Sequence, residues 1–470
     1  HLILTEILLR ENLILHQIQK HILNSIKDIR KENSHQDMIW NPSKETMSRD
    51  QMRVIQSRRL VKLVKYVYTN VPFYRHKMQD VSVDPGDIQS IDDIVKLPFT
   101  TKQDLRDNYP YGLQAAPMSE IVRVHASTGT TGKPTIVTYT RHDLEIWAEC
   151  LSRALTAAGM GRNDTFSVSY GYGLFTGGLG AHYGVENIGA SVLPASTGGS
   201  EKHIRLLRDL RVTGLAATPS YMLYLAEQME KLGIRKEELS LRSALCGAEP
   251  YTEAMRQEIQ SRMGLKVFNI YGLSEIIGPG VSYECDEQNG SHICEDHFFP
   301  EIIDPVTLES LPLGSQGELV FTTLTKAGLP LIRYRTRDIS SLMQGQCSCG
   351  RTSIRMSPIV GRSDDMLVIR GINVFPSQIE TVLTEFPSFT PYYFITVDRK
   401  NNEDTFDLDV ELRPEFFSVN PEKQMPFIKP LYDRIVSLVG IKPNIHILPP
   451  GSIERSIGKA KHVNDKRKFQ

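Results

Sequence analysis

The chain has 470 residues, of which 40% are hydrophobic and 23% charged, and its formal net charge is -1. A chain of this length can bury a sizeable core and divide into about two or three domains. The balance of 54 lysines and arginines against 55 aspartates and glutamates leaves no basic field, so nucleic-acid binding is not expected.

Three features bear on the cellular compartment. The apolar stretch at residues 2–15 is broken by charged side chains and falls short of the ~18 uninterrupted apolar residues of a membrane span. It also lacks the basic start and the small-residue cleavage site of a secretory signal. Six cysteines in a chain of this length favour reduced thiols over a disulfide scaffold. No membrane span and a cytoplasmic location are therefore expected.

Residues 1–39 are predicted to form an amphipathic extension. Its apolar residues recur at helical spacing up to a charged run at residues 27–32, and they are Leu4, Leu8, Leu15, Ile18, Ile22, Ile26 and Ile29. A peripheral helix without chemistry is the favoured interpretation. Docking to a partner, or formation of a homodimer, is the alternative.

From residue 40 onward, helical patterns alternate with short apolar stretches that are typical of buried strands. Six such strands are predicted at residues 121–125, 135–139, 165–169, 214–218, 242–246 and 266–270. This alternation favours an α/β fold with largely parallel strands, and residues 40–360 are interpreted as one large domain with several subdomains. Ligands of such sheets sit at strand ends, so chemistry is expected in the loops that follow the strands.

A smaller domain with an α+β pattern is predicted for residues 361–470, after a polar boundary segment at residues 362–365. Pro376 can open a helix whose apolar face carries Ile379, Val382, Leu383 and Phe386. Alternating apolar and acidic residues at 406–412 predict a half-buried strand, and residues 444–448 repeat the strand pattern.

A run of small and hydroxyl residues follows the first predicted strand, and its composition suits phosphate binding. The run comprises Ser127, Thr128, Gly129, Thr130, Thr131, Gly132 and Lys133. Glycines allow backbone N–H groups to approach an anion, hydroxyls add donors, and a lysine adds positive charge. The G-x-x-x-x-G-K-[ST] P-loop needs glycine at Ser127 and a hydroxyl at Pro134, and both are missing. The run is therefore predicted to bind nucleotide in a geometry other than that of a P-loop.

Further motifs follow in order along the chain. They are GAEP at 247–250, YGLSE at 271–275, YRTRD at 334–338, GRSDD at 361–365 and a terminal Gly458-Lys459. Together with residues 127–134 they resemble the adenylate-forming superfamily of acyl-coenzyme A synthetases. Within it the likeness to phenylacetate–coenzyme A ligases is greatest, on residues 45–49, 97–102, 295–298 and 373–377. The likeness is collinear from about residue 40 to residue 467.

The resemblance implies a large adenylation domain, a small mobile C-terminal domain, and a reaction that uses ATP, Mg2+ and coenzyme A. The carboxylate of the substrate would attack the α-phosphate to give an acyl-adenylate and pyrophosphate. Coenzyme A would then take the acyl group and release AMP. An aryl acid such as phenylacetate is the expected substrate. Two alternatives stay open, namely transfer to a carrier-protein thiol and a binding protein with an inactive nucleotide site.

The same resemblance assigns roles to residues of the large domain. Glu275 matches the magnesium-binding acid, Tyr271 the aromatic that stacks on adenine, and Asp338 the acid that binds the ribose hydroxyls. Other residues expected to contact ATP or AMP are Gly247, Ala248, Glu249, Pro250, Gly272, Ser274 and Arg362. Arg337 departs from the family, which usually has glycine there, so the backbone or the exposure just before Asp338 is expected to differ.

In the C-terminal segment, Lys459 matches the mobile lysine that bridges the substrate carboxylate and the α-phosphate during adenylation. Asp364 aligns with the hinge on which the small domain turns between the two half-reactions. Arg370 and Gly371 are expected to contact coenzyme A in the second conformation.

Aromatic residues and glycines are combined at positions 170–178, just after a predicted strand. Tyr170, Tyr172 and Phe175 are the candidate walls of a flat apolar pocket for the acid. A packed strand end is an equally good interpretation of these residues alone, and the resemblance favours the pocket.

Cysteine and histidine residues suggest a structural zinc site. Cys285, His292, Cys347 and Cys349 supply the three thiolates and one imidazole of a closed tetrahedral site. Cys294 is an alternative to His292 as the fourth ligand, and Cys246 is a further cysteine available as a ligand. The interpretation without metal is a set of free buried thiols.

Overall fold

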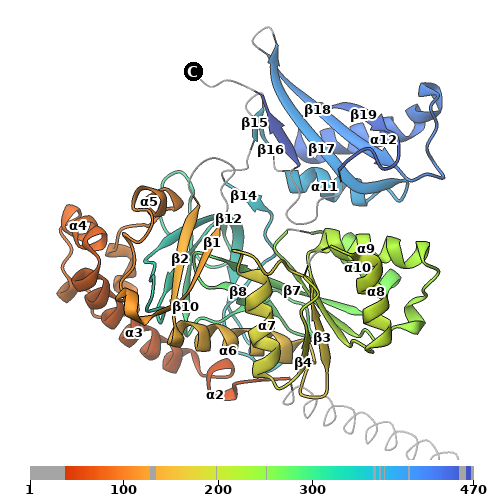
Figure 1. Cartoon of the computed structure of the whole chain (residues 1–470). Helices are drawn as coiled ribbons and strands as arrows, with labels where there is room; N and C mark the ends of the chain where they lie inside the picture. The colour runs from red at the N-terminus through yellow and green to blue at the C-terminus, as the bar shows by residue number, and fades with distance from the viewer. Residues whose placement is uncertain are drawn as a thin grey trace, which may run out of the picture.

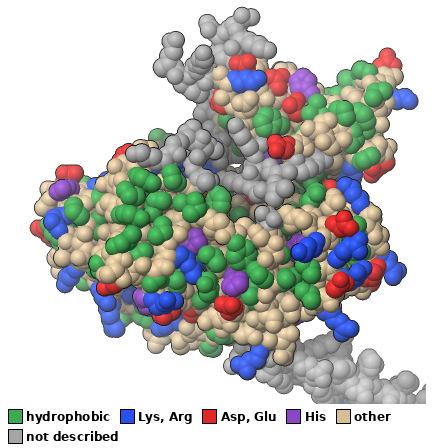
Figure 2. Space-filling model, in the orientation of Figure 1, with side chains coloured by type: hydrophobic (Ala, Val, Ile, Leu, Met, Phe, Trp, Pro, Cys, Tyr) green, Lys and Arg blue, Asp and Glu red, His purple; other side chains and the backbone are tan. Residues whose placement is uncertain are grey.

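The computed structural model describes residues 38–127, 134–196, 198–249, 251–363, 367–369, 372–374, 376–400, 403–454 and 462–466 (Figure 1). The helix predicted within residues 1–39 lies outside these ranges. Within them, no helix combines the length and apolar character needed to cross a lipid bilayer. On the face in Figure 2, basic and acidic side chains are interspersed, in keeping with the balanced charge of the sequence.

Helices from the first part of the chain cover one side of the main body (Figure 1). They are α2 (Pro42–Glu45), α3 (Arg49–Asn70), α4 (Pro72–Asp80) and α5 (Lys102–Asp107), with short 3-10 helices at Pro85–Asp87, Ile91–Lys96 and Met118–Glu120. The N-cap of α5 is Thr101, whose side chain accepts a hydrogen bond from the N–H of Asp104. This cap places Lys102 at the first position of the helix.

A mixed sheet of twelve strands organises the main body of the described chain. Its parallel half runs in the order β4 (Ser191–Leu193), β3 (Thr165–Val168), β5 (Gly214–Ala217), β6 (Ser243–Gly247) and β7 (Lys266–Leu273). The sheet continues antiparallel through β8 (Gly278–Glu284), β9 (Ser291–Ile293), β13 (Arg355–Met356), β12 (Tyr334–Met343), β11 (Gln316–Thr323) and β10 (Phe298–Ile303). The short β14 (Gly361–Arg362) pairs with β12.

The predicted α/β fold is confirmed, but parallel pairing is limited to one half of the sheet. The strands predicted at residues 121–125 and 135–139 form an antiparallel hairpin outside the large sheet, from β1 (Ile121–Ser127) and β2 (Thr135–Thr140). An apolar pattern predicts that a strand is buried, whereas its direction depends on how it is connected to its neighbours. For this reason the sequence pattern did not distinguish the two halves.

Helices cover both faces of the parallel half. They are α6 (Arg141–Ala157) and α7 (Gly177–Asn187) on one face and α8 (Ser200–Asp209), α9 (Pro219–Lys231) and α10 (Glu253–Met263) on the other, with a short 3-10 helix at Lys236–Glu238. Neighbouring residues of one strand point to opposite faces. In β5, Ala216 accordingly joins the core under α6 and α7, while Leu215 and Ala217 join the core under α8 to α10.

The C-terminal elements form a separate lobe, coloured blue in Figure 1. They are β15 (Leu367–Ile369), β16 (Ile372–Val374), α11 (Pro376–Thr384), β17 (Phe389–Lys400), β18 (Glu403–Leu412), α12 (Pro421–Val439), β19 (Asn444–Leu448) and β20 (Val463–Asp465). Four strands form a sheet in the order β19-β18-β17-β20, and the lobe has its own apolar core. The predicted helix from Pro376 and the predicted strands at 406–412 and 444–448 are confirmed.

Candidate functional site

The carboxyl ends of the parallel strands meet at one edge of the sheet, where the sequence predicts nucleotide binding. Gly247 ends β6 and is followed by Ala248 and Glu249, and Tyr271 lies near the end of β7. The two strands pair in parallel with Gly247 opposite Ile270, so their ends lie side by side. A Cβ at Gly247 would lie 2.2 Å from the Ile270 carbonyl oxygen, so only glycine allows the backbones of the two strands to lie this close together here.

Tyr271, Asp338 and Arg362 come together from β7, β12 and β14. The Tyr271 hydroxyl donates to Asp338 Oδ2 at 2.6 Å, and Arg362 Nη1 donates to Asp338 Oδ1 at 3.1 Å. Burial raises the pKa of Tyr271 well above its ordinary value, and the neighbouring Asp338 carboxylate raises it further. The hydroxyl is therefore held protonated, as a donor to the Asp338 side chain.

A bulge in β12 directs Asp338 toward this edge. Around residues 336–338, β12 advances four residues (335 to 339) where its partner β11 advances two (318 to 320). The Asp338 N–H donates to the Thr336 hydroxyl at 3.0 Å within the bulge. Arg337 has a φ of 70°, in the left-handed region that favours glycine. The arginine at this position thus occupies a backbone conformation that suits the glycine usual in the resembled family.

Glu275 is buried at the same edge, just after β7. One of its oxygens, Oε1, accepts a hydrogen bond from Ser127 Oγ at 2.9 Å and lies 3.1 Å from Lys102 Nζ. Burial alone would raise the pKa of Glu275, but the charge of Lys102 and the hydrogen bonds outweigh it and hold the pKa below its ordinary value. Glu275 is therefore an ionised carboxylate beside Ser127, the first residue of the run that the sequence predicts to bind phosphate.

Lys326 is a second lysine at this site, and unlike Lys102 it is buried. Sequence reasoning gave it no role. Its ammonium group donates to the Glu275 carbonyl oxygen at 3.0 Å and lies 4.8 Å from the centre of the Tyr139 ring. Burial lowers the pKa of Lys326 to about 7, against the opposing influence of the Asp143 and Glu275 carboxylates. The Tyr139 hydroxyl donates to the Ser274 carbonyl oxygen at 3.1 Å, so both side chains support the segment that carries Glu275.

The aromatic segment at 170–178 lies against the same motif. The Thr176 hydroxyl is 3.0 Å from the Ser274 hydroxyl, and the Leu174 carbonyl oxygen accepts a hydrogen bond from the Ala126 N–H in β1. Tyr170 is half-buried and its hydroxyl donates to the Ala217 carbonyl oxygen at 3.0 Å, at the end of β5.

The other two aromatic residues of that segment differ in burial. The Tyr172 hydroxyl is 3.2 Å from His182 Nδ1 in α7, and its ring packs against the main core. Phe175 is 51% exposed. The described residues thus bring the segment to the candidate site, with Phe175 turned to solvent.

Several predicted site residues lie outside the described residues. They are Thr128, Gly129, Thr130, Thr131, Gly132, Lys133, Pro250, Asp364, Arg370, Gly371 and Lys459. Ser127, the residue before the first of these gaps, is described and contacts Glu275. Lys102 was found only through the structure, although it lies in the 97–102 segment that carries part of the family resemblance.

The chain is similar to known AMP-binding enzymes over most of its length. A profile described as AMP-binding enzyme matches residues 60–325, and one described as AMP-binding enzyme C-terminal domain matches residues 371–467. A phenylacetate-coenzyme A ligase of Thermus thermophilus is 48% identical over 92% of this chain and 100% of its own length. One of Escherichia coli strain K12 is 49% identical over 90% of this chain and 97% of its own.

Solved structures of a 2-hydroxyisobutyryl-CoA ligase share the fold. The crystal structure in the postadenylation state, in complex with R3-HIB-AMP, superposes with a TM-score of 0.86 at 26% identity, over 92% of this chain and 93% of that one. The structure of the same ligase in the thioesterification state, with 2-HIB-AMP and CoA, gives a TM-score of 0.69 at 27% identity, again over 92% of this chain and 93% of that one. The lobes of the present structure are therefore arranged more like the former.

The strained backbone at Arg337 allows a direct test. We expect Arg337→Gly to raise the free energy of unfolding by roughly 1 kcal/mol, because glycine adopts the left-handed conformation without a Cβ clash. Arg337→Ala is the matched control, since it removes the same side chain, including a 3.6 Å contact with Glu318, but keeps the Cβ. Urea unfolding of the three proteins measures the effect. A glycine variant less stable than the alanine variant would contradict the analysis.

The lowered pKa of Lys326 predicts a pH dependence of stability. Between pH 7 and pH 10.5 the unfolded chain binds more protons at this residue than the folded protein, so its contribution to stability increases with pH, by at most about 1.4 kcal/mol per pH unit. We expect Lys326→Met to flatten this dependence. Urea unfolding at pH 7.5 and 9.5 checks the slope, with Lys231→Met at an exposed position as control. An unchanged slope in Lys326→Met would refute the assignment.

Proposed function

Because this chain belongs to the phenylacetate–coenzyme A ligase family of AMP-binding enzymes, we propose that its preferred substrate is phenylacetate or a close aryl relative. It is an AMP-forming acid–thiol ligase. In the first half-reaction a carboxylate oxygen bonds to the α-phosphorus of ATP and the bond to pyrophosphate breaks. In the second, the sulfur of coenzyme A bonds to the acyl carbon and AMP leaves. A cytoplasmic location, where ATP and coenzyme A are both present, is part of the proposal.

The observation that carries the assignment of the nucleotide site is the contact of Tyr271, Asp338 and Arg362 beside the end of β6. An ionised carboxylate has two oxygens that can accept hydrogen bonds from the ribose hydroxyls, which is the role we assign to Asp338. Tyr271 supplies a ring for adenine, with the backbone of residues 247–250 beside it. Residues 127–133 supply N–H groups, hydroxyls and the Lys133 charge for the phosphates.

Magnesium is the metal that this reaction implies, and Glu275 fits it. Its carboxylate is buried, its pKa lies below the ordinary value, and ionised oxygens are the ligands that Mg2+ prefers. When bound, Mg2+ would neutralise charge on the phosphates. Lys102 Nζ lies 3.1 Å from Glu275 Oε1 and adds a fixed positive charge beside this carboxylate. We infer that the pair lowers the repulsion between the attacking carboxylate and the triphosphate.

The aromatic segment at 170–178 is the proposed acyl pocket, formed by Tyr170, Tyr172 and Phe175. Its contact with Ser274 supports this assignment, because the acid must lie beside the nucleotide to reach the α-phosphorus. The exposed side chain of Phe175 is free to turn inward when an aryl group binds.

We further propose that residues 40–360 form the adenylating domain and that residues 361–470 form a mobile domain with its hinge at Asp364. A separate apolar core in the C-terminal lobe supports the division. One described contact between the lobe and the main body is an ion pair, with Arg413 Nη2 at 3.4 Å from Glu258 Oε1. In this proposal Arg370 and Gly371 contact coenzyme A after the domain has turned, and Lys459 acts before it turns.

Substrate choice is tested with a panel of acids. We expect kcat/KM for phenylacetate to exceed that for benzoate, which lacks one methylene, by about 10- to 200-fold, since that is the discrimination a single methylene provides. Pyrophosphate release with ATP is the measurement, with hexanoate as the aliphatic control and with coenzyme A present or omitted. Equal use of hexanoate would contradict the aryl assignment. Multiple turnover when coenzyme A is omitted would contradict the assignment of coenzyme A as the acceptor of the acyl group.

The role of Lys459 is tested on the separate half-reactions. We expect Lys459→Ala to slow adenylation by about 100-fold or more, the scale of a lost contact to charge in the transition state. Attack of coenzyme A on preformed phenylacetyl-adenylate should continue at the rate of the wild type. The control is Lys461→Ala, which removes a lysine from the same segment. Equal loss in both half-reactions would refute a role confined to adenylation.

A further inference from the structure

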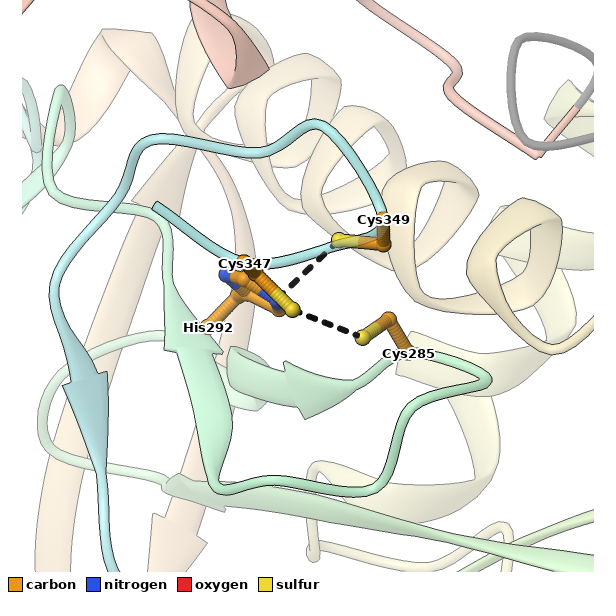
Figure 3. Close-up of side chains that lie close together, drawn as sticks. All are labelled: Cys285, His292, Cys347 and Cys349. Carbon is orange, nitrogen blue, oxygen red and sulfur yellow. Dashed lines mark hydrogen bonds between the residues drawn. The ribbon is translucent and has the colours of Figure 1, made fainter. Parts of the chain in front are cut away.

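Cys285, His292, Cys347 and Cys349 come together in the fold (Figure 3). Because β8 runs antiparallel to β7, the cluster lies at the end of the sheet away from the nucleotide edge. Cys285 directly follows β8, His292 lies in β9, and the other two lie in the irregular chain at 344–354 between β12 and β13. β9 pairs with both β8 and β13, so the sheet itself brings the two halves of the cluster together. All four side chains are buried.

The distances within the cluster are those of a tetrahedral zinc site. Zn–S bonds of ~2.3 Å and Zn–N bonds of ~2.0–2.1 Å, at tetrahedral angles, place two sulfurs about 3.8 Å apart and sulfur and nitrogen about 3.5 Å apart. Cys285 Sγ and Cys347 Sγ are 3.8 Å apart, and Cys349 Sγ is 3.5 Å from His292 Nε2. A disulfide bond would need ~2.05 Å, so the pair of sulfurs is not a disulfide.

The imidazole is already oriented for a metal. His292 Nδ1 lies 3.0 Å from the hydroxyl of Ser353, which can accept a hydrogen bond from an N–H at that nitrogen. The Nε2 lone pair then faces the three sulfurs. Zinc-binding histidines are commonly held in this way by a hydrogen bond at the second nitrogen.

Other candidate ligands are engaged elsewhere. Cys294 Sγ donates to the Gly280 carbonyl oxygen at 3.5 Å, and Cys246 lies in β6. The sequence left Cys294 open as the fourth ligand, and the structure selects His292.

A second group with ligand-type atoms, made by Glu149, Cys150 and His297, is also buried in part. Arg153 already neutralises Glu149 at 2.7 Å, and His297 Nε2 is 3.2 Å from the Asp296 carboxylate. A buried guanidinium supplies the positive charge there, so this group does not need a cation.

We propose that Cys285, His292, Cys347 and Cys349 bind one Zn2+ that has a structural role. Four protein ligands close the tetrahedron and leave no position for a substrate. The seven residues of β8 separate the cluster from the segment that carries Glu275, a span of about 20 Å at ~3.3 Å per residue. The ion is therefore too far from the phosphates to take part in the reaction.

The zinc connects the irregular chain at 344–354 to the sheet and, through Arg351, to α2. Arg351 is buried two residues after Cys349, and its Nε donates to Glu45 Oε2 at 2.7 Å. The same carboxylate oxygen accepts from the Tyr283 hydroxyl at 2.9 Å. Arg351 Nη2 also donates to the Met38 carbonyl oxygen at 2.6 Å. Loss of the ion should therefore loosen residues 38–47 together with 344–354.

Metal analysis of the full chain, expressed in zinc-replete medium and purified without added metal, tests the proposal. We expect about one zinc per chain in the wild type and less than about 0.1 in Cys349→Ser, because a structural site binds weakly once a thiolate is lost. The matched control is Cys294→Ala, which removes a buried cysteine two residues from His292 and should keep its zinc. Wild-type protein with less than about 0.1 zinc per chain, and none taken up on addition, would overturn the proposal.

Two measurements keep the test valid if Cys349→Ser does not fold. Exchange of the wild-type metal for Co2+ should produce the strong visible bands of tetrahedral cobalt with sulfur-to-cobalt charge transfer, and pale octahedral cobalt would overturn the assignment. Hydrogen exchange after removal of the metal should increase at residues 38–47 and 344–354 while residues 266–275 stay protected. An increase confined to 266–275 would contradict a structural role at the far end of β8.

Discussion

The pairing of β7 is the constraint on which the rest of the fold depends, because this strand runs parallel to β6 and antiparallel to β8. Parallel pairing brings the carboxyl ends of β6 and β7 to one edge, where Gly247 and Tyr271 meet. Antiparallel pairing sends β8 back across the sheet, and Cys285 follows at the opposite end. One strand thus fixes two chemically different places, and the length of β8 sets the distance between them.

Charge at the nucleotide edge is balanced within the protein before any phosphate arrives. Glu275 is kept ionised by Lys102, while Lys326 is bound to the backbone of the same residue. The bulge around Arg337 adds Asp338, which is held by Tyr271 and Arg362. Tyr271, Asp338 and Arg362 lie in strands of a single sheet, and Lys102 lies at the first position of α5. These groups therefore need little reorganisation when ligands bind, which is the condition for effective electrostatic catalysis.

Sequence reasoning selected residues that belong to ordered motifs, and it gave no role to Lys326, which stands out only because the fold buries it. Tyr271, Asp338 and Arg362 were identified because each lies in a pattern that only one kind of enzyme combines. Lys326 had no such pattern, and a lysine in an isolated sequence resembles any solvated side chain until the fold buries it. His292 and Cys294 stand two positions apart, so their spacing could not decide between them. The difference came from β9, which ends at Ile293 and leaves Cys294 to turn toward Gly280.

The cysteine–histidine cluster lies at the far end of β8 from Glu275. The supply of metal should therefore affect the amount of folded enzyme and not the catalytic rate of each molecule. The proposed zinc would close a long stretch of chain between Cys285 and Cys349, and it would contribute when the fold is completed and not when substrate reacts. Zinc starvation would accordingly reduce how many intact copies a cell accumulates. The enzyme molecules that hold zinc would keep their full catalytic rate, so the cell would contain a smaller amount of active enzyme.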